Sequence, residues 1–396
     1  MGHELRTAEL QLDDRLKVLR VLTASAVYPE VPDVPCVGSI LPRDIDCACA
    51  NRDRRRPLGH KLFCSGRVRI VRVLKRELPR VVHCLSGTAA VAWAEALDAA
   101  ALRLPLVTSL TGRDLGLLSS EGLQSRRLRC ALRMAARVIV ESDEAFRQVR
   151  CHDISCDKIL KIPRGVSLDS IEPRGPRSPL SRALDPRFRV LFAGPLVERQ
   201  GLAFLIEAVA RLSRKSPGLH LTVVGAGRFL RPAKSLIAHL GIRNSVEILS
   251  RPVPCGDLLD LCSRVDVFVA PSITAKDGDR EAGFPPGMLL AMAAALPVVA
   301  TRHAGIPEIV EEVVTGFLAP ERDVDGLVAA LARARSCALR ARAIGYAARS
   351  RIHRDHNARH CDAELERAYF SAAATCLPRS CLSGSVPRFN TSHIWQ

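Results

Sequence analysis

The sequence predicts an α/β fold of two domains, each built on a parallel β-sheet that is flanked by helices. Its 396 residues are enough for two separate hydrophobic cores. From Arg189 to Pro320, short apolar runs alternate with Gly/Pro turns and helical patterns, as they do in βα units around a buried parallel sheet. Residues 171–187 are rich in proline and charge, a composition typical of a linker between two domains.

The second half of the chain predicts its elements most clearly. Strands are expected, in this order, in the segments RVLFA, LHLTVV, VDVFVA, PVVAT and GFLA. Residues 288–300 fit a short helix and then a buried strand, with Pro297 between them. Beyond these we expect a helix over residues 324–334 and a longer one within 340–373, whereas the residues from Cys376 onward show no periodicity.

The first half is less regular. Residues 16–23 predict a first strand and residues 68–76 a helix, and the segment that begins PRVVHCLSG predicts a strand, a helix and a further strand. Residues 136–141 predict another strand, after which Ser142 is a suitable N-cap for a helix. Residues 28–64 are rich in Pro, Cys and Arg and predict no element, so we expect an irregular and shortened first domain.

Composition limits where the chain works. No apolar run approaches the roughly 20 residues that a membrane-spanning helix needs. The N-terminal residues include Glu4, Glu9 and Asp13 and lack an apolar block, so no signal peptide is visible. We therefore expect a soluble cytoplasmic protein.

The formal net charge of +17 comes mostly from arginine and is scattered along the chain. Two interpretations remain open: a solvated Arg-rich surface, or peripheral attraction to anionic headgroups at the inner face of the membrane. Nucleic acid is not an expected partner, because aromatic residues make up only 4% of the chain and provide no stacking platform.

Cysteine and histidine spacing does not predict a metal site. Cys47 and Cys49, and Cys151 with Cys156, form loose clusters without the paired Cys-x-x-Cys spacing of a tetrahedral zinc site. Three histidines at i, i+3 and i+7 would share one face of a continuous helix: His353, His356 and His360. A basic surface helix is the commoner explanation of that pattern, and we expect neither a metal nor a cofactor.

Four loops in the second half carry residues suited to a nucleotide-sugar donor. They span residues 194–201, 277–281, 283–287 and 303–308, and the third places prolines at a helix start. In order and spacing, this segment resembles the donor-binding half of the family 4 glycosyltransferases of the GT-B fold. The resemblance implies two Rossmann-like domains that face each other across a cleft, where ligands bind at the carboxyl ends of the strands.

The resemblance also implies donor contacts. Glu281 matches the first carboxylate of the family's Glu-x7-Glu pair, which binds the transferred sugar, so we expect it to be catalytic. Arg199 either reaches the diphosphate or points to solvent, and the sequence favours neither alternative. Further residues that the resemblance places around the donor are Gly194, Gly283, Phe284, Pro285 and Gly305.

Several donor positions depart from the family pattern. Pro195 and Gln200 stand where the family has an Arg and a Lys on the phosphates. Leu290, or Leu289 if no insertion is allowed, stands where the second Glu of the pair holds the ribose. The loss of two cations and a carboxylate removes most of the charged contacts with a donor.

The first half resembles the acceptor-side domain of the same family, over fewer motifs. His83 ends a strand before a Gly-containing turn, and Thr111-Gly112-Arg113-Asp114 follows the next strand where the family commonly has His-Gly-x-Asp. The resemblance implies substrate contacts for His83 and Thr111 and a catalytic role for Asp114. A threonine hydrogen-bonds a sugar hydroxyl but does not exchange a proton near neutral pH as imidazole does.

We accordingly expect four parts. They are an acceptor-side domain over residues 1–172, a donor domain over 173–345, a helix over 346–375 that returns to the first domain, and a loose tail over 376–396.

The expected function is a hexosyltransferase-like, retaining glycosyltransferase of cell-surface polysaccharide or glycoconjugate synthesis. Its partners would be a nucleotide-sugar donor and a glycan or lipid-linked acceptor. The alternative is a degenerate relative that serves as a partner subunit or has no activity. Another enzyme on the same scaffold, such as a nucleotide-sugar epimerase or a glycan phosphorylase, is less favoured. A phosphorylase would carry a lysine for pyridoxal phosphate, and none of the second domain's lysines is placed convincingly for it: Lys215, Lys234 and Lys276.

Overall fold

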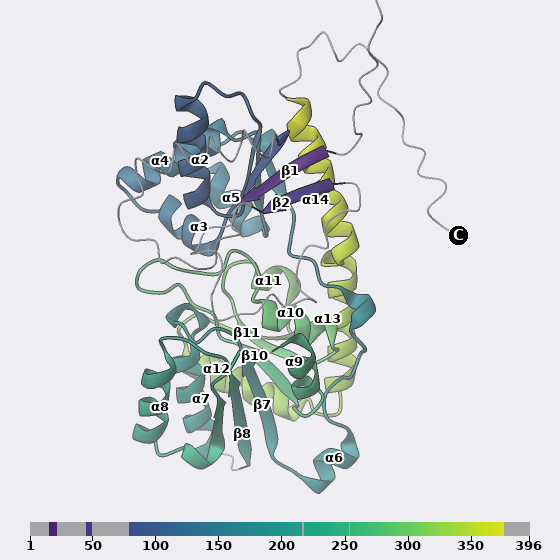
Figure 1. The fold of residues 1–396 in the computed structure, drawn as a ribbon. Helices are drawn as coiled ribbons and strands as arrows, with labels where there is room; N and C mark the ends of the chain where they lie inside the picture. Colours follow the sequence, from purple (N-terminus) through teal and green to yellow (C-terminus); the bar gives the residue numbers. More distant parts are fainter. Residues whose placement is uncertain (1–15, 22–44, 50–78, 216–217, 253, 376–396) are drawn as a thin grey trace, which may run out of the picture.

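The structure is a computed structural model, and it describes residues 16–21, 45–49, 79–215, 218–252 and 254–375 (Figure 1). The helix expected over residues 68–76 and the tail expected over 376–396 lie outside these ranges. None of the helices in the described ranges is long and apolar enough to cross a bilayer.

The first domain is built on a six-stranded parallel sheet in the order β2-β1-β3-β4-β5-β6. Its strands are β1 (Leu16–Val21), β2 (Ile45–Cys49), β3 (Val81–Cys84), β4 (Leu106–Ser109), β5 (Arg137–Val140) and β6 (Ile159–Lys161). Its helices are α2 (Gly87–Ala99), α3 (Gly112–Leu118), α4 (Leu123–Met134) and α5 (Asp143–Arg150). Strand β2 corrects the sequence analysis, which predicted no element in residues 28–64, because its IDCAC sequence lacks the β-branched alternation that marks a strand.

The second domain is built on a six-stranded parallel sheet in the order β12-β11-β10-β7-β8-β9. Its strands are β7 (Phe188–Ala193), β8 (Leu219–Val224), β9 (Val246–Leu249), β10 (Val267–Ala270), β11 (Val298–Thr301) and β12 (Gly316–Ala319). The helices are α7 (Leu202–Lys215), α8 (Leu230–His239), α9 (Cys255–Cys262), α10 (Pro286–Ala293), α11 (Ile306–Ile309) and α12 (Val324–Ser336). Strands β7 and β10 are neighbours, but the chain continues from β7 to β8 on one side and from β10 to β11 on the other. The loops after β7 and β10 therefore form the topological switch point of the sheet.

The C-terminal segment crosses from the second domain to the first as two helices (Figure 1). Helix α13 (Ala341–Asp355) packs against α10, and α14 (Ala358–Ala374) packs against β3 and β4. The sequence predicted one long helix here, and the structure corrects this. The chain breaks at His356 and Asn357, where Asn357 forms a parallel bridge with Val166 beside the other interdomain crossing.

The proline-rich segment between the sheets is attached to the second domain. The amides of Arg174 and Gly175 donate to the carbonyl of Ala294. Arg177 forms a buried ion pair with Asp266 at 2.7 Å, and the short helix α6 (Pro179–Leu184) follows. The segment therefore joins the two domains, as its composition predicted, but it is held against the second domain by these contacts.

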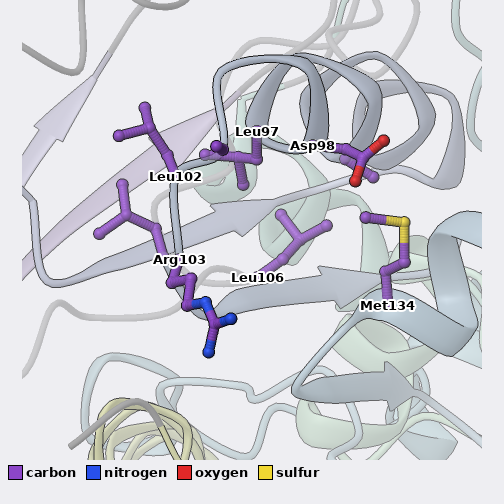
Figure 2. A pocket seen from close by; sticks show the side chains of 9 residues that line it. Leu97, Asp98, Leu102, Arg103, Leu106 and Met134 are labelled. Atoms are coloured by element: carbon purple, nitrogen blue, oxygen red, sulfur yellow. The ribbon is translucent and has the colours of Figure 1, made fainter.

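One surface hollow of about 390 Å³ lies on the first domain beside Leu97, Leu106 and Met134 (Figure 2). Leu106 is the first residue of β4, so this hollow is at the amino ends of the strands. The hollow therefore lies away from the edge where a Rossmann-like sheet binds its ligands.

Candidate active site

The carboxylate of Glu281 lies at the carboxyl ends of the second sheet, in the loop between β10 and α10. Glu281 is only 7% exposed. Gln200 Nε2 donates to Glu281 Oε1 at 2.6 Å, and Arg199 Nε donates to the same oxygen at 3.3 Å. Both partners come from the loop after β7, so the two switch-point loops meet at this carboxylate.

Arg199 is buried, with an exposed fraction of 7%, so it does not point to solvent. Its guanidinium bridges Glu281 and Asp279, with an N–O distance of 3.2 Å to Asp279 Oδ2. Gly201, two residues after Arg199, has φ +65°, and a Cβ there would meet the carbonyl oxygen of Pro271 at 1.7 Å. The glycine thus lets the Arg199 loop lie directly against the chain that leaves β10.

A histidine holds the backbone of Glu281. The amide of Glu281 donates to His303 Nε2 at 3.3 Å, and His303 Nδ1 lies 2.8 Å from Glu321 Oε2. Because Nε2 accepts, this arrangement requires the tautomer with its proton on Nδ1. The hydrogen bond from His303 is the main cause that lowers the pKa of Glu321 from 4.5 to about 2.

The Glu281 loop presses on the first domain. A Cβ on Gly112 would meet the carbonyl oxygen of Arg280 at 1.6 Å, and one on Gly116 would meet that of Gly278 at 2.1 Å. Both glycines lie on α3, so this helix forms the opposite wall of the candidate site. The side chain of Arg280 reaches across to Glu144 at 3.1 Å.

Gly283 and Gly305 make similar close approaches. A Cβ on Gly283 would lie 2.7 Å from Glu141 Cβ, and one on Gly305 would lie 2.7 Å from Ser142 Cβ. Both contacts fall at the junction of β5 and α5 in the first domain. Glycine at these two positions therefore allows the domains to touch.

Thr111 and Asp114 form a capping box at the start of α3. Asp114 Oδ2 accepts from the Thr111 amide, from Thr111 Oγ1 and from the Gly87 amide, at 2.7 to 2.8 Å. Asp114 is 2% exposed. It therefore fixes Thr111 and ties α3 to the start of α2.

His83 is engaged inside the protein. Its ring is 1% exposed, Nδ1 lies 2.7 Å from the hydroxyl oxygen of Tyr369, and Nε2 lies 2.9 Å from Ser109 Oγ. Tyr369 belongs to the returning helix α14. The structure therefore places His83 between the first sheet and α14, with both nitrogens hydrogen-bonded.

Phe284 and Pro285 precede helix α10. Phe284 is 4% exposed and packs edge-on against His356 at the break between α13 and α14, with ring centroids 4.7 Å apart. Pro285 occupies the N-cap position of α10. These residues set the start of α10, whereas Leu290 on that helix is 1% exposed and belongs to the core.

Gly194 directly follows β7 and faces the Gln200 side chain. A Cβ there would lie 3.3 Å from Gln200 Oε1. The Gly194 amide donates to the Val224 carbonyl, so the glycine also keeps the loop in register with β8.

Sequence reasoning missed several residues of this arrangement. Asp279 and Glu321 contact Arg199 and His303. Glu308 of α11 crosses the interface: its carboxylate accepts from the amides of Asp143 and Glu144 at 3.0 and 3.1 Å and so caps α5. A charged residue beside a motif is the only signal that the sequence offers for these contacts.

Residues 187–336 match the family model of glycosyl transferases group 1. This match confirms the resemblance that the sequence predicted. An amylovoran biosynthesis glycosyltransferase of Erwinia amylovora is 37% identical over 163 residues, which cover 41% of this chain and 40% of that protein. A GDP-mannose-dependent alpha-(1-6)-phosphatidylinositol monomannoside mannosyltransferase of Mycolicibacterium smegmatis is 32% identical over 195 residues, with coverages of 48% and 50%. The chain thus spans half or less of these relatives' length.

Solved structures of glycosyltransferases share the fold over more of the chain. Sucrose-phosphate synthase of Thermosynechococcus elongatus has a TM-score of 0.71 and 17% identity, covering 91% of this chain and all of that one. Anabaena HepE in complex with UDP has a TM-score of 0.63 and 20% identity, with coverages of 83% and 86%. The α/β fold of two Rossmann-like domains in the GT-B arrangement is therefore confirmed.

Proposed function

We propose that this chain transfers a hexosyl group from a nucleotide-sugar donor to a glycan or lipid-linked acceptor, with retention of configuration. The reaction would serve cell-surface polysaccharide or glycoconjugate synthesis. The observation that carries the proposal is the position of Glu281: its carboxylate lies at the switch point of the second sheet, and its loop abuts α3 of the first domain. The matched family and the names of the relatives support the reaction class.

In the proposed site, Glu281 accepts hydrogen bonds from hydroxyls of the transferred sugar. Gln200 and the backbone contact with His303 hold it in place before the donor arrives. Thr111 on the opposite wall donates its hydroxyl proton to Asp114, which positions it, and its hydroxyl oxygen accepts from a substrate hydroxyl. Pre-organised groups of this kind act without reorganisation during the reaction.

Arg199 supplies the cation for the donor diphosphate in this proposal. Its guanidinium now pairs with Glu281 and Asp279. When a diphosphate enters, the guanidinium exchanges one carboxylate for phosphate oxygens, a charge-assisted contact that suits its planar fork. The exchange also releases Glu281 for the sugar.

The alternative function is a degenerate relative without turnover that acts as a partner subunit. One observation favours it: the cation of the site is already neutralised by two carboxylates. The positions of Pro195 and Gln200 add no further positive charge, and Leu290 is buried in the core.

Donor turnover with Glu281→Gln distinguishes the two functions. Release of nucleoside diphosphate is measured from a panel of nucleotide sugars. Because charge-assisted hydrogen bonds contribute roughly 1.5–3 kcal/mol, the substitution should lower kcat/KM by about ten- to a hundredfold. Glu207→Gln on α7 is the matched control and should change nothing. No turnover of any donor by the unsubstituted protein, or equal turnover in Glu281→Gln, would reject the proposed role.

We also propose a cytoplasmic location with peripheral contact at an anionic membrane. The net charge of +17 supports it, since each basic residue near an anionic surface contributes about 1 kcal/mol. Flotation with vesicles that contain anionic lipid should recover the protein at low salt and lose it at high salt. Equal recovery with neutral vesicles would contradict this contact.

A further inference from the structure

A hollow of about 430 Å³ lies on the first domain, lined by residues from the end of α3, the start of α4 and the segment just after α5. It is distinct from the Glu281 site: α3 starts at that site with Gly112 and reaches the hollow with Leu118. The volume falls within the range of small-ligand pockets. The residues that line it are Leu118, Ser119, Ser120, Glu121, Gly122, Arg126, Arg129 and His152.

Two arginines of α4 face this hollow without a carboxylate partner. Arg126 and Arg129 are one turn apart, so they are neighbours on the helix surface. Within the described ranges, neither makes an ion pair. By contrast, Arg127 and Arg133 on the same helix pair with Glu95 and Asp153. The unpaired cations are thus the two that line the hollow.

The remaining lining groups suit an oxyanion. His152 lies close enough to Arg129 that burial and this cation together lower the pKa of its imidazole, against the opposing effect of Asp153. Ser119 Oγ already contacts Gln148 Nε2 at 2.6 Å and is left to donate its own proton outward. Glu121 is the one acidic lining residue and is exposed.

We propose that this hollow binds a phosphate monoester through the guanidinium groups of Arg126 and Arg129, with His152 and Ser119 as further donors. Two guanidinium groups and an imidazole provide several donors for the three terminal oxygens of a phosphate. The hollow is larger than a phosphate alone needs, so it also accommodates the group to which the phosphate is esterified. The proposal holds whether or not Glu281 takes part in sugar transfer.

Nuclear magnetic resonance of the His152 ring tests the proposal. Its signal is assigned with His152→Gln, and glycerol 3-phosphate is titrated against the full chain. A bound dianion stabilises the imidazolium, so the pKa of His152 should rise as the ester saturates the site. Arg126→Ser with Arg129→Ser should weaken binding about tenfold or more, since each charge-assisted contact is worth roughly that factor.

Matched variants separate a site from general positive charge. Arg127→Ser removes the same charge from the same helix and should leave the affinity unchanged. Arg126→Lys with Arg129→Lys keeps the charge and should retain part of the binding. Equal weakening in Arg127→Ser would overturn the proposal.

A second arm identifies the source of the phosphate. Vesicles that contain phosphatidic acid are compared with vesicles of phosphatidylcholine alone. If glycerol 3-phosphate binds, the site accepts a soluble ester; if only phosphatidic acid vesicles bind in an Arg126- and Arg129-dependent way, it accepts a lipid headgroup. If neither probe depends on these arginines, the site does not exist.

Discussion

Arg199 lies where a donor diphosphate is expected, yet its charge is taken up by Glu281 and Asp279. The sequence placed Arg199 and Glu281 in the site through their spacing in the two loops. It did not predict that they touch, because a contact between residues separated by 82 positions depends on how both loops leave the sheet. The burial of Arg199 was not predicted either, because it depends on the same approach of the two loops.

The pair of His303 and Glu321 behind Glu281 predicts a pH effect on stability. Because the pKa of Glu321 is lowered from 4.5 to about 2 by its hydrogen bond with His303, the folded state favours the ionised carboxyl. This stabilisation is complete above about pH 4.5 and is lost as the pH falls towards 2. Glu321→Gln keeps the size of the side chain, removes the charge and leaves only one oxygen to accept from the Thr274 amide or from His303.

The melting temperature of Glu321→Gln should therefore lie below that of the unsubstituted protein at pH 6, and the difference should shrink as the pH is lowered through this window. Thermal unfolding of both proteins at a series of pH values measures this difference in melting temperature. Glu172→Gln, at an exposed position, serves as the control. A difference that stays constant with pH would show that the ionised form of Glu321 is not preferred in the folded state.

Helices α5 and α11 show how single elements hold the two domains together. Glu308 on α11 caps α5 across the interface, and Gly305 at the start of α11 lies against Ser142, the N-cap of α5. The sequence predicted the α5 N-cap from Ser142 correctly, because N-capping is local. It gave no sign of the second cap from Glu308, which depends on the approach of a separate domain.

Removal of this interdomain cap should loosen α5. Glu308→Ala is expected to cost about 1 kcal/mol of stability, the usual effect of losing an N-cap. Hydrogen exchange at the amides of Asp143 and Glu144 should accelerate, while exchange in the strands of the second sheet stays the same. Glu311→Ala, at an exposed neighbouring position, is the control. Unchanged exchange at both amides would mean that Glu308 does not cap α5 in solution.

The whole molecule is two parallel sheets joined at two adjacent crossings. Apolar runs and Gly/Pro turns predicted β1, β3, β4 and β5 of the first sheet and five of the six strands of the second, because each strand of a buried parallel sheet carries its own pattern. They did not predict β2 or β9. The break between α13 and α14 was missed, since the helical pattern continues through His356 while the bridge of Asn357 to Val166 is a long-range contact. Gly165 allows that crossing, because a Cβ there would meet Ala358 Cα at 2.6 Å.

The close contact between the two domains raises the question whether a nucleotide can enter the candidate site. Loops of the second domain rest on α3 and α5, and the cation that would hold a diphosphate is paired internally. A functional donor site requires that a nucleotide displace these contacts at a modest cost. A degenerate site would keep them.

Calorimetric titration of the full chain with a panel of nucleoside diphosphates tests this point most directly. We expect one of them to bind with a Kd in about the micromolar range, equivalent to roughly −8 kcal/mol. Arg199→Ala should weaken that binding about tenfold or more, because it removes a charge-assisted contact with the phosphates. No heat of binding from any member of the panel, or equal affinity in Arg199→Ala, would contradict the account.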